Sequence, residues 1–392
     1  MIKIALVHHI NFNHLSLSFK QRTDYIEKYL EKILDAIIVK TNISICTEDL
    51  LLLKVWNPKV YRRLINHPKV NFLFSTHNHA IPLIYPETFT EQMLLGSKVI
   101  LDLINPKKIQ GVGYPSEVDF PPKISFESIC KVWEGIILGE SRIKISGLEK
   151  DEFSPVFTIN DAWSKNKIRG HLSRRAFNYR DYLHKYFRDE ANSGEMLLGI
   201  QDDYKKYAQG SVLLARIDLE VILFNAPIVD GIQQEPPINK FRDLQKYLIN
   251  HNVDFLKVAD LDKTDYKIPE YRISDIAPCS SENIKWNNKS LKRRVENIKF
   301  DRSNKLKYGI WLSLQCSDYY CTNFQDLCFS YGDKNKKTIF ITKTRIYRDQ
   351  ESGIKLKLLQ GKTLDQIKMN DNELEKYMQY FMKSNELLTN YL

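Results

Sequence analysis

Two carboxylates, Asp218 and Glu220, come directly after an apolar run that starts at Ser211 and has the character of a buried strand. An ionised side chain at such a place is costly unless it is paired or opens into a cleft, and the carboxyl ends of strands in α/β folds form clefts. Residues two apart on a strand point to the same side, so one carboxylate could react while the other orients a substrate or changes its neighbour's pKa. The alternative is that both are solvated, or paired with Arg216, in the loop after the strand.

A second candidate acid, Glu117, lies in a loop-like segment with glycines before it and two prolines after it (Gly111-Val112-Gly113-Tyr114-Pro115-Ser116-Glu117-Val118-Asp119-Phe120-Pro121-Pro122). The glycines would let the backbone approach a ligand closely, and Tyr114 offers a flat apolar face. Two carboxyl groups that face each other across a cleft are the minimum needed to cleave a glycosidic bond. Glu117 and one of the two carboxylates at Asp218 and Glu220 are therefore a candidate catalytic pair.

The composition excludes several classes of protein. With 392 residues, 43% hydrophobic and 27% charged, the chain is globular and can bury a large core. Its net charge of +10 would permit nucleic-acid binding, but the basic residues form short runs without a recognised motif, so we expect no nucleic-acid partner. No apolar run reaches the roughly 18 residues of a membrane span, and the first strand starts at Ile2 without a signal peptide, which predicts a cytoplasmic protein.

The six cysteines are scattered without a CxxC pair, and we expect neither a metal ion nor another cofactor. Many Lys and Ile residues and few Gly residues suit a protein from a hot environment. A homo-oligomer is compatible with the sequence, which does not fix an oligomeric state.

Strand and helix patterns alternate along the first two thirds of the chain, which is typical of a parallel sheet or barrel wrapped in helices. The predicted strands are 2–7, 36–39, 70–74, 108–112, 135–138, 156–159, 212–217 and 255–258. Helices are predicted between them, notably at 88–104 and 241–248. Later segments are mainly helical, at 283–300, 306–324 and 372–391, with one late strand at 337–341. We therefore expect a barrel over residues 1–275 and a mainly helical C-terminal domain over 276–392.

Further motifs follow one another along the chain. The first strand ends in Val7-His8-His9-Ile10, and a later strand is followed by Ser75-Thr76-His77-Asn78-His79-Ala80-Ile81-Pro82-Leu83 and Glu91-Gln92. After Glu117 and Asp218-Leu219-Glu220 come Ile273-Ser274-Asp275, Trp286 and Gln315-Cys316-Ser317-Asp318-Tyr319-Tyr320. In this order and spacing, the motifs resemble those of the family 57 glycoside hydrolases, particularly the α-amylase branch, from Ile2 to about Phe324.

The resemblance implies a distorted TIM-like (β/α)7 barrel followed by a helical C-terminal domain, acting on α-linked glucans by a retaining mechanism without a metal ion. Glu117 would be the nucleophile, and Asp218 would protonate the leaving oxygen and then activate water, with the two carboxyl groups about 5 to 5.5 Å apart. The implied substrate-binding residues are His8, His9, His77, His79, Tyr114, Glu220, Trp286, Asp318 and Tyr319.

The sequence departs from the family's pattern at three places. Ile10 stands where the first motif has proline, Leu223-Phe224-Asn225 replaces Gly-Glu-His, and Tyr319 replaces the histidine of Ser-Asp-His. These changes leave open a shifted substrate, a reaction like that of a 4-α-glucanotransferase, or a non-catalytic carbohydrate-binding barrel. A metal-dependent polysaccharide deacetylase with His77 and His79 as ligands is a further alternative, although the first strand lacks the Asp pair that it would need.

Overall fold

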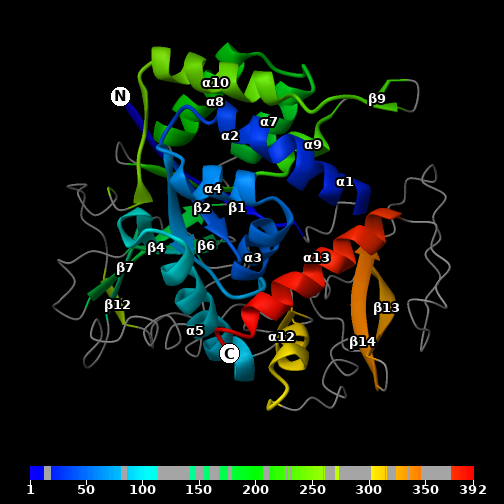
Figure 1. Ribbon diagram of the computed structural model, residues 1–392. Coiled ribbons are helices and arrows are strands. Elements are labelled where there is room, and N and C mark those ends of the chain that lie inside the picture. Colours follow the sequence, from blue (N-terminus) through cyan, green and yellow to red (C-terminus); the bar gives the residue numbers. More distant parts are fainter. Residues whose placement is uncertain are drawn as a thin grey trace.

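The computed structural model describes residues 1–12, 19–80, 86–113, 142–146, 153–158, 167–174, 179–205, 212–226, 228–229, 232–258, 260, 270–272, 302–313, 315, 324–333, 336–345 and 372–392. Within these residues a central sheet is covered by helices (Figure 1). The α/β class expected from the alternating patterns is thereby confirmed.

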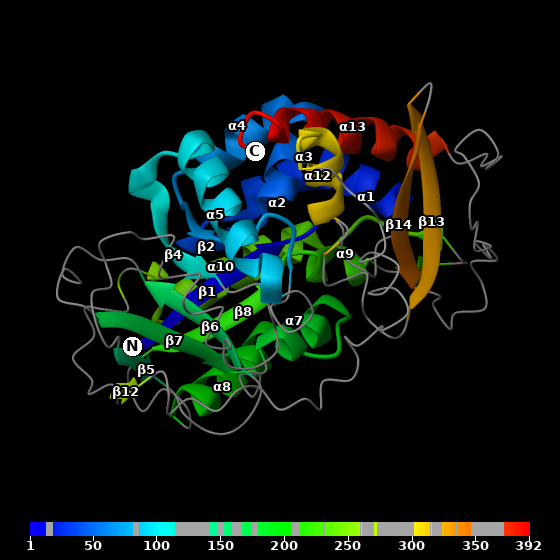
Figure 2. The ribbon, with the colours of Figure 1, turned by 90° about the horizontal axis from the view of Figure 1, so that it is seen from below.

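The sheet contains ten strands among the described residues, in the order β11-β1-β2-β3-β4-β6-β7-β5-β12, with β8 also paired to β1. Their bounds are β1 Ile2–Ile10, β2 Thr41–Ile45, β3 Val70–Phe74, β4 Ile109–Gly113, β5 Arg142–Ser146, β6 Phe153–Thr158, β7 Lys167–Arg174, β8 Leu213–Asp218, β11 Val253–Phe255 and β12 Glu270–Arg272. Strands β8, β11, β1, β2, β3 and β4 form parallel pairs, whereas β6 runs antiparallel to β4 and β7. Strands β7 and β8 lie near each other, so the sheet curves round (Figure 2).

Helices from both ends of the chain surround this sheet. Their bounds are α1 Phe19–Asp24, η1 Tyr25–Tyr29, α2 Leu30–Ala36, α3 Thr47–Trp56, α4 Pro58–Asn66, α5 Pro86–Leu103, η2 Pro106–Lys108, α7 Tyr179–Phe187, α8 Ser193–Asp203, α9 Val221–Phe224, α10 Ile238–Asn250, α12 Lys305–Ser313 and α13 Asn372–Leu388. Two hairpins complete the elements: β9 (Ile228–Val229) with β10 (Ile232–Gln233), and β13 (Phe324–Asp333) with β14 (Lys336–Arg345). Among the described helices, none is both long enough and apolar enough to cross a membrane.

Strand β1 divides the core because its successive side chains point to opposite faces. Ile4 and Leu6 belong to the large cluster formed with the surrounding helices. Ala5 and Val7 belong to a smaller cluster with Leu73 of β3 and with Leu256 and Val258, which follow β11. The alternation continues to the end of the strand and sets the directions of His8 and His9.

Most predicted elements that fall on described residues are confirmed, including β1, β8, α5, α10 and, to the residue, β3 at 70–74. The strand predicted at 36–39 is wrong, because α2 extends to Ala36 and the next strand is Thr41–Ile45. The helix predicted at 306–324 ends at Ser313, and Phe324 starts β13, whose partner β14 contains the late strand expected at 337–341. The elements predicted at 135–138 and 283–300 lie outside the described residues.

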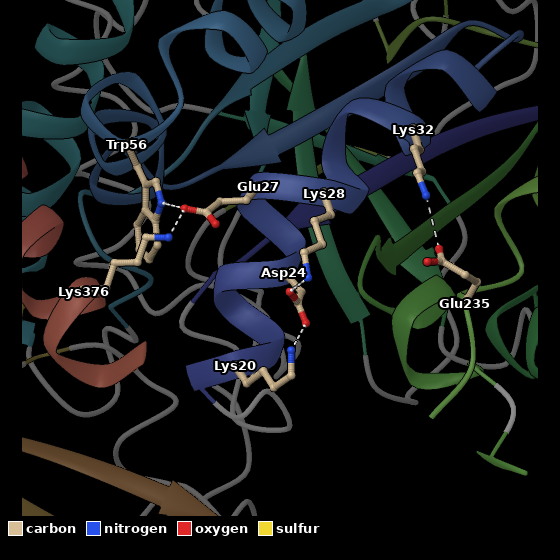
Figure 3. Close-up of polar contacts among 8 residues, drawn as sticks. All are labelled: Lys20, Asp24, Glu27, Lys28, Lys32, Trp56, Glu235 and Lys376. Atoms are coloured by element: carbon tan, nitrogen blue, oxygen red, sulfur yellow. Dashed lines mark hydrogen bonds and ion pairs between the residues drawn. The ribbon is translucent and has the colours of Figure 1, made fainter. Parts of the chain in front are cut away.

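The C-terminal helix α13 packs across α1 and α3 (Figure 1). Glu27 of η1 accepts a hydrogen bond from Trp56 Nε1 at 2.7 Å and pairs with Lys376 Nζ at 2.6 Å (Figure 3). The Trp56 ring also stacks on Tyr380 at a centroid distance of 4.6 Å. Buried residues of α12 and α13, such as Trp311 and Phe381, belong to the same hydrophobic cluster as β1 and α3. The last helices are therefore part of the core around the sheet.

Candidate active site

Four neighbouring parallel strands, β8, β1, β2 and β3, end at the same edge of the sheet. His9 of β1 lies opposite Asp218 of β8 and, on its other side, opposite Ser44 of β2. The segments that leave these strands are rich in polar residues with little or no solvent exposure. Because polar and charged groups are costly to bury unless they have partners or a function, we take this edge as the candidate active site.

Asp218 and Glu220 differ in exposure although they are only two residues apart. Asp218 is the last residue of β8 and is partly exposed, whereas Glu220 is fully buried. The chain turns between them, where Leu219 N donates to the His9 carbonyl at 2.8 Å, and Glu220 is the residue that precedes α9. The strand rule that aligns residues i and i+2 therefore stops at Asp218. Of the two carboxylates, Asp218 is the one that a ligand can reach.

Glu220 holds two strand ends together. Its Oε1 accepts a hydrogen bond at 2.8 Å from the backbone N of Asn11, just after β1. Beside it lies the buried Tyr25 of η1, and the pKa of the Tyr25 hydroxyl is raised well above its ordinary value by burial and then by the charges of Glu220, Asp49 and Asp218. Tyr25 consequently stays neutral, and Glu220 has a structural contact with the backbone that sequence reasoning did not anticipate.

The consecutive histidines of β1 point to opposite faces of the sheet. The His8 ring meets Phe241 of α10 edge-on at a centroid distance of 5.9 Å. Burial lowers the pKa of His8 to about 4, although the charge of Asp218 opposes this, so the ring is neutral at pH 7. The His9 ring lies 4.2 Å from the ring of His79. This placement gives His8 a packing role under α10 and puts His9 beside His79.

The segment 75–80 after β3, here called the histidine loop, carries His77 and His79. The Thr47 hydroxyl lies 3.0 Å from His77 Nδ1, and Glu48 N donates to the His77 carbonyl at 2.8 Å. Burial lowers the pKa of His77 to about 3, so its neutral ring can donate one hydrogen bond and accept another. His79 is partly exposed and has a φ of 66°, a left-handed conformation that non-glycine residues adopt rarely. Such a backbone persists only where its surroundings hold it.

Helix α5 supports the histidine loop from outside the sheet. His77 N donates to the Gln92 carbonyl at 3.1 Å, and the Gln92 side chain reaches the end of α12. Gly96 allows this close approach, because a Cβ atom there would overlap with the carbonyl oxygen of Ser75. From the sequence, Gln92 was noted only as part of the Glu91-Gln92 motif, without a role of its own, and Gly96 was an ordinary position of a predicted helix.

Two further acids at this edge were missed from the sequence. Glu48 and Asp49 lie in the first turn of α3, directly after β2, and both are buried. A helix N-terminus favours carboxylates, which helps to explain how they are tolerated there. They were missed because the strand was predicted at 36–39. A strand predicted at its true position, Thr41–Ile45, would have placed both acids just after a strand end.

From the predicted residues the structure thus brings together Asp218, His9 and His79, with His77 and Glu220 nearby. The predicted residues Glu117, Tyr114, Trp286, Asp318 and Tyr319 lie outside the described residues. Within the described part of the chain, no three His, Cys, Asp or Glu side chains converge as a metal ion would require.

Comparisons with known proteins give a match only at the level of structure. No protein-family model matches the sequence, and no curated protein matches it. The 4-α-glucanotransferase from Thermococcus litoralis is similar in structure, with a TM-score of 0.52 and 12% sequence identity over 82% of this chain and 56% of that enzyme. An exo-type maltose-forming amylase from Pyrococcus sp. ST04 matches with a TM-score of 0.43 and 13% identity over 70% of this chain and 51% of that one. The chain shares its fold with the glucanotransferase and spans little more than half of that enzyme's length.

Proposed function

We propose that the protein is a retaining glycoside hydrolase or transglycosidase that acts on α-linked glucans. The observation that carries the proposal is the row formed by Asp218, His9 and His79 at the carboxyl edge of the sheet, in which a partly exposed carboxylate adjoins two imidazoles in ring contact. The fold shared with a 4-α-glucanotransferase and the resemblance of the motifs to family 57 glycoside hydrolases both support an α-glucan as substrate.

In this proposal Asp218 is the acid/base and Glu117 the nucleophile. The Glu117 carboxylate attacks the anomeric carbon, forming a glycosyl ester, while Asp218 gives its proton to the leaving glycosidic oxygen. Asp218 then takes a proton from water or from the hydroxyl of a second glucan, whose oxygen attacks the anomeric carbon and breaks its ester bond to Glu117; water gives hydrolysis, and the glucan hydroxyl gives transfer. Its position at the end of β8, partly open to solvent, suits a group that exchanges protons with both molecules.

The histidines would bind and orient the sugar ring. His77 is neutral at pH 7, and with its Nδ1 beside the Thr47 hydroxyl its Nε2 is the ring nitrogen that would donate to or accept from a sugar hydroxyl. His79, which is partly exposed, is the nearer of the two to an incoming ligand, and His9 supports it from below. Glu220 would act indirectly, by keeping the ends of β8 and β1 in register through Asn11.

The test is product analysis with maltooligosaccharides and glycogen at elevated temperature, comparing wild type, Glu117→Gln and Asp218→Asn. We expect shorter or both shorter and longer oligosaccharides from wild type, and a rate lowered by about 10²–10⁴-fold in Asp218→Asn, which is the usual contribution of a general acid/base. Asp202→Asn is the matched control, since the Asp202 side chain on α8 is 81% exposed and pairs with Lys205 on the surface.

Glucan binding measured by calorimetry separates the alternatives. Binding by wild type and by both site variants, with products from none of them, would overturn the enzymatic proposal in favour of a carbohydrate-binding protein. Equal rates for Asp218→Asn and Asp202→Asn would remove Asp218 from the reaction.

A further inference from the structure

Gln92 of α5 joins three segments that are distant in sequence, and it is fully buried. Its backbone carbonyl accepts a hydrogen bond from His77 N in the histidine loop at 3.1 Å. Its side-chain amide donates at 3.2 Å to the carbonyl of Leu312, in the last turn of α12, and at 3.1 Å to Oε1 of Gln315. The residue therefore connects the loop that carries His77 and His79 with the end of a helix more than half the chain away.

The end of α12 accepts further hydrogen bonds from the histidine loop and from α5. The Leu312 carbonyl also accepts hydrogen bonds from Asn78 Nδ2 in the histidine loop and from Gln315 N. Oε1 of Gln315 accepts a second bond, at 2.6 Å, from the hydroxyl of Thr88 on α5. All of these side chains are buried, where hydrogen bonds to neutral partners gain strength from the low dielectric constant. The network fixes the loop, α5 and α12 relative to one another.

We propose that Gln92 is a positioning residue for the glucan site, and that it holds the histidine loop in the arrangement that brings His79 onto His9. The left-handed backbone of His79 needs support from its surroundings, and the bonds of Gln92 and Asn78 to α12 supply it on the side away from the sheet. The proposal rests on the proposed function only for the choice of the reaction whose rate is measured.

The chain offers a matched control in Gln245 of α10, which is also buried. Its Nε2 donates at 3.1 Å to the carbonyls of Ala36 and Phe241, and its Oε1 accepts from Ile38 N at 3.1 Å. Gln92→Leu and Gln245→Leu therefore each remove a buried amide with comparable bonds, in nearly the same volume. Only the first amide reaches the Leu312 carbonyl, which also accepts the hydrogen bond from Asn78 of the histidine loop; the backbone bond from His77 N to the Gln92 carbonyl is kept in the variant.

The first readout is the NMR signal of the imidazoles in protein labelled at histidine, which requires no activity. We expect the signals of His79 and His9 to shift in Gln92→Leu and to keep their wild-type positions in Gln245→Leu. This readout is independent of turnover. If the protein has no activity on glucans, the proposed function is refuted, but the imidazole signals still decide whether Gln92 has the positioning role. Unshifted His79 and His9 signals in a folded Gln92→Leu would overturn the role.

The second readout is kinetic. We expect kcat on maltooligosaccharides to fall about tenfold or more in Gln92→Leu, since small displacements of site groups have effects of this size, with KM changed less than kcat. Gln245→Leu should stay within about twofold of wild type. Gln315→Leu, which leaves the bond from Gln92 to Leu312 intact, should act in the same direction and more weakly, and it replaces Gln92→Leu if that variant does not fold. Equal kcat in Gln315→Leu, Gln92→Leu and Gln245→Leu would contradict the proposal.

Discussion

The two sides of the candidate site are held in place by different kinds of contact. On one side, the backbone ladder between β1 and β8 sets His9 opposite Asp218, and Glu220 adds a bond to the backbone of Asn11. On the other side, the histidine loop has only two backbone bonds among the described residues that link it to α3 and α5, at His77, and it depends further on the buried amides of Asn78 and Gln92 that meet at the end of α12. A ladder tolerates most side-chain changes, whereas a loop held by individual amides does not. We therefore expect the first side to be robust, except at Glu220, and the second to be sensitive.

Glu220→Ala should give the largest loss of stability, because it removes a buried side-chain contact between the ends of β8 and β1. The change leaves Asn11 N buried without its acceptor and opens a cavity, which should cost about 2–4 kcal/mol of unfolding free energy. Urea unfolding followed by circular dichroism measures it. Glu235→Ala is the control, since that side chain is 70% exposed and pairs only with Lys32 at 3.2 Å (Figure 3). A loss no greater than that of the control would mean that the ladder alone holds this side.

Acid should weaken both sides through their buried neutral histidines. The pKa of His8 is lowered by burial from 6.5 to about 4 in the folded protein, so the unfolded chain binds more protons between these values. Stability is therefore intact above pH 6.5 and is lost as the pH falls toward 4, by about 2 kcal/mol at pH 5 for this group. His77 of the histidine loop, with a pKa lowered by burial to about 3, acts in the same direction.

Urea unfolding at several pH values between 4.5 and 7.5 tests this. In His8→Gln and in His77→Gln, the unfolding free energy should decrease less as the pH falls than in wild type. His251→Gln, a change at an exposed histidine, is the control and should keep the wild-type dependence on pH. If neither variant changes the slope, other groups account for the acid sensitivity.

The strand side was also the easier of the two to predict from the sequence. The apolar run that ends at Asp218 and the opening run that ends at His9 are continuous hydrophobic patterns, and parallel strands of this kind meet at their carboxyl ends. The strand at Thr41–Ile45 was missed because its polar residues do not look like a core strand. Asn42 is fully buried there because its amide bonds the carbonyls of Leu6 and Leu256 and the backbone N of Val258. The strand was assigned instead to the neighbouring apolar run, which ends at Val39.

The support of the histidine loop could not be predicted in this way. It depends on which buried amides find partners across more than 200 residues of chain, and no local pattern encodes such pairs. The spacing of His77 and His79 marked the loop as polar, but the left-handed backbone of His79 and the contact of its ring with His9 follow from tertiary contacts alone. Gly96 carried the one available signal, as a glycine inside a helix often marks a close approach.

Gly96→Ala should affect the histidine-loop side of the site and leave the strand side unchanged. Alanine favours the helix by about 1 kcal/mol, but its Cβ would overlap with the Ser75 carbonyl oxygen, and displacing backbone costs about 1–3 kcal/mol. We expect a net loss of up to about 2 kcal/mol and displaced imidazole NMR signals from the histidine loop. Gly199→Ala on α8 is the control, since the added methyl group meets only the side chain of Tyr182, which can move. Stabilisation by Gly96→Ala would mean that the loop has room to shift.

The smallest effect is expected where α13 docks, at a distance from both sides of the site. Burial raises the pKa of Glu27, but hydrogen bonds from Lys376 and Trp56 outweigh it and leave that pKa below its ordinary value. Lys376→Met removes one of these two donors at a position 40% exposed, where an ion pair contributes about 0.5 kcal/mol, and the bond from Trp56 Nε1 remains (Figure 3). Unfolding free energy should therefore change little and the histidine signals not at all. A shift of the His79 signal in this variant would show that α13, and not only the end of α12, holds the histidine loop.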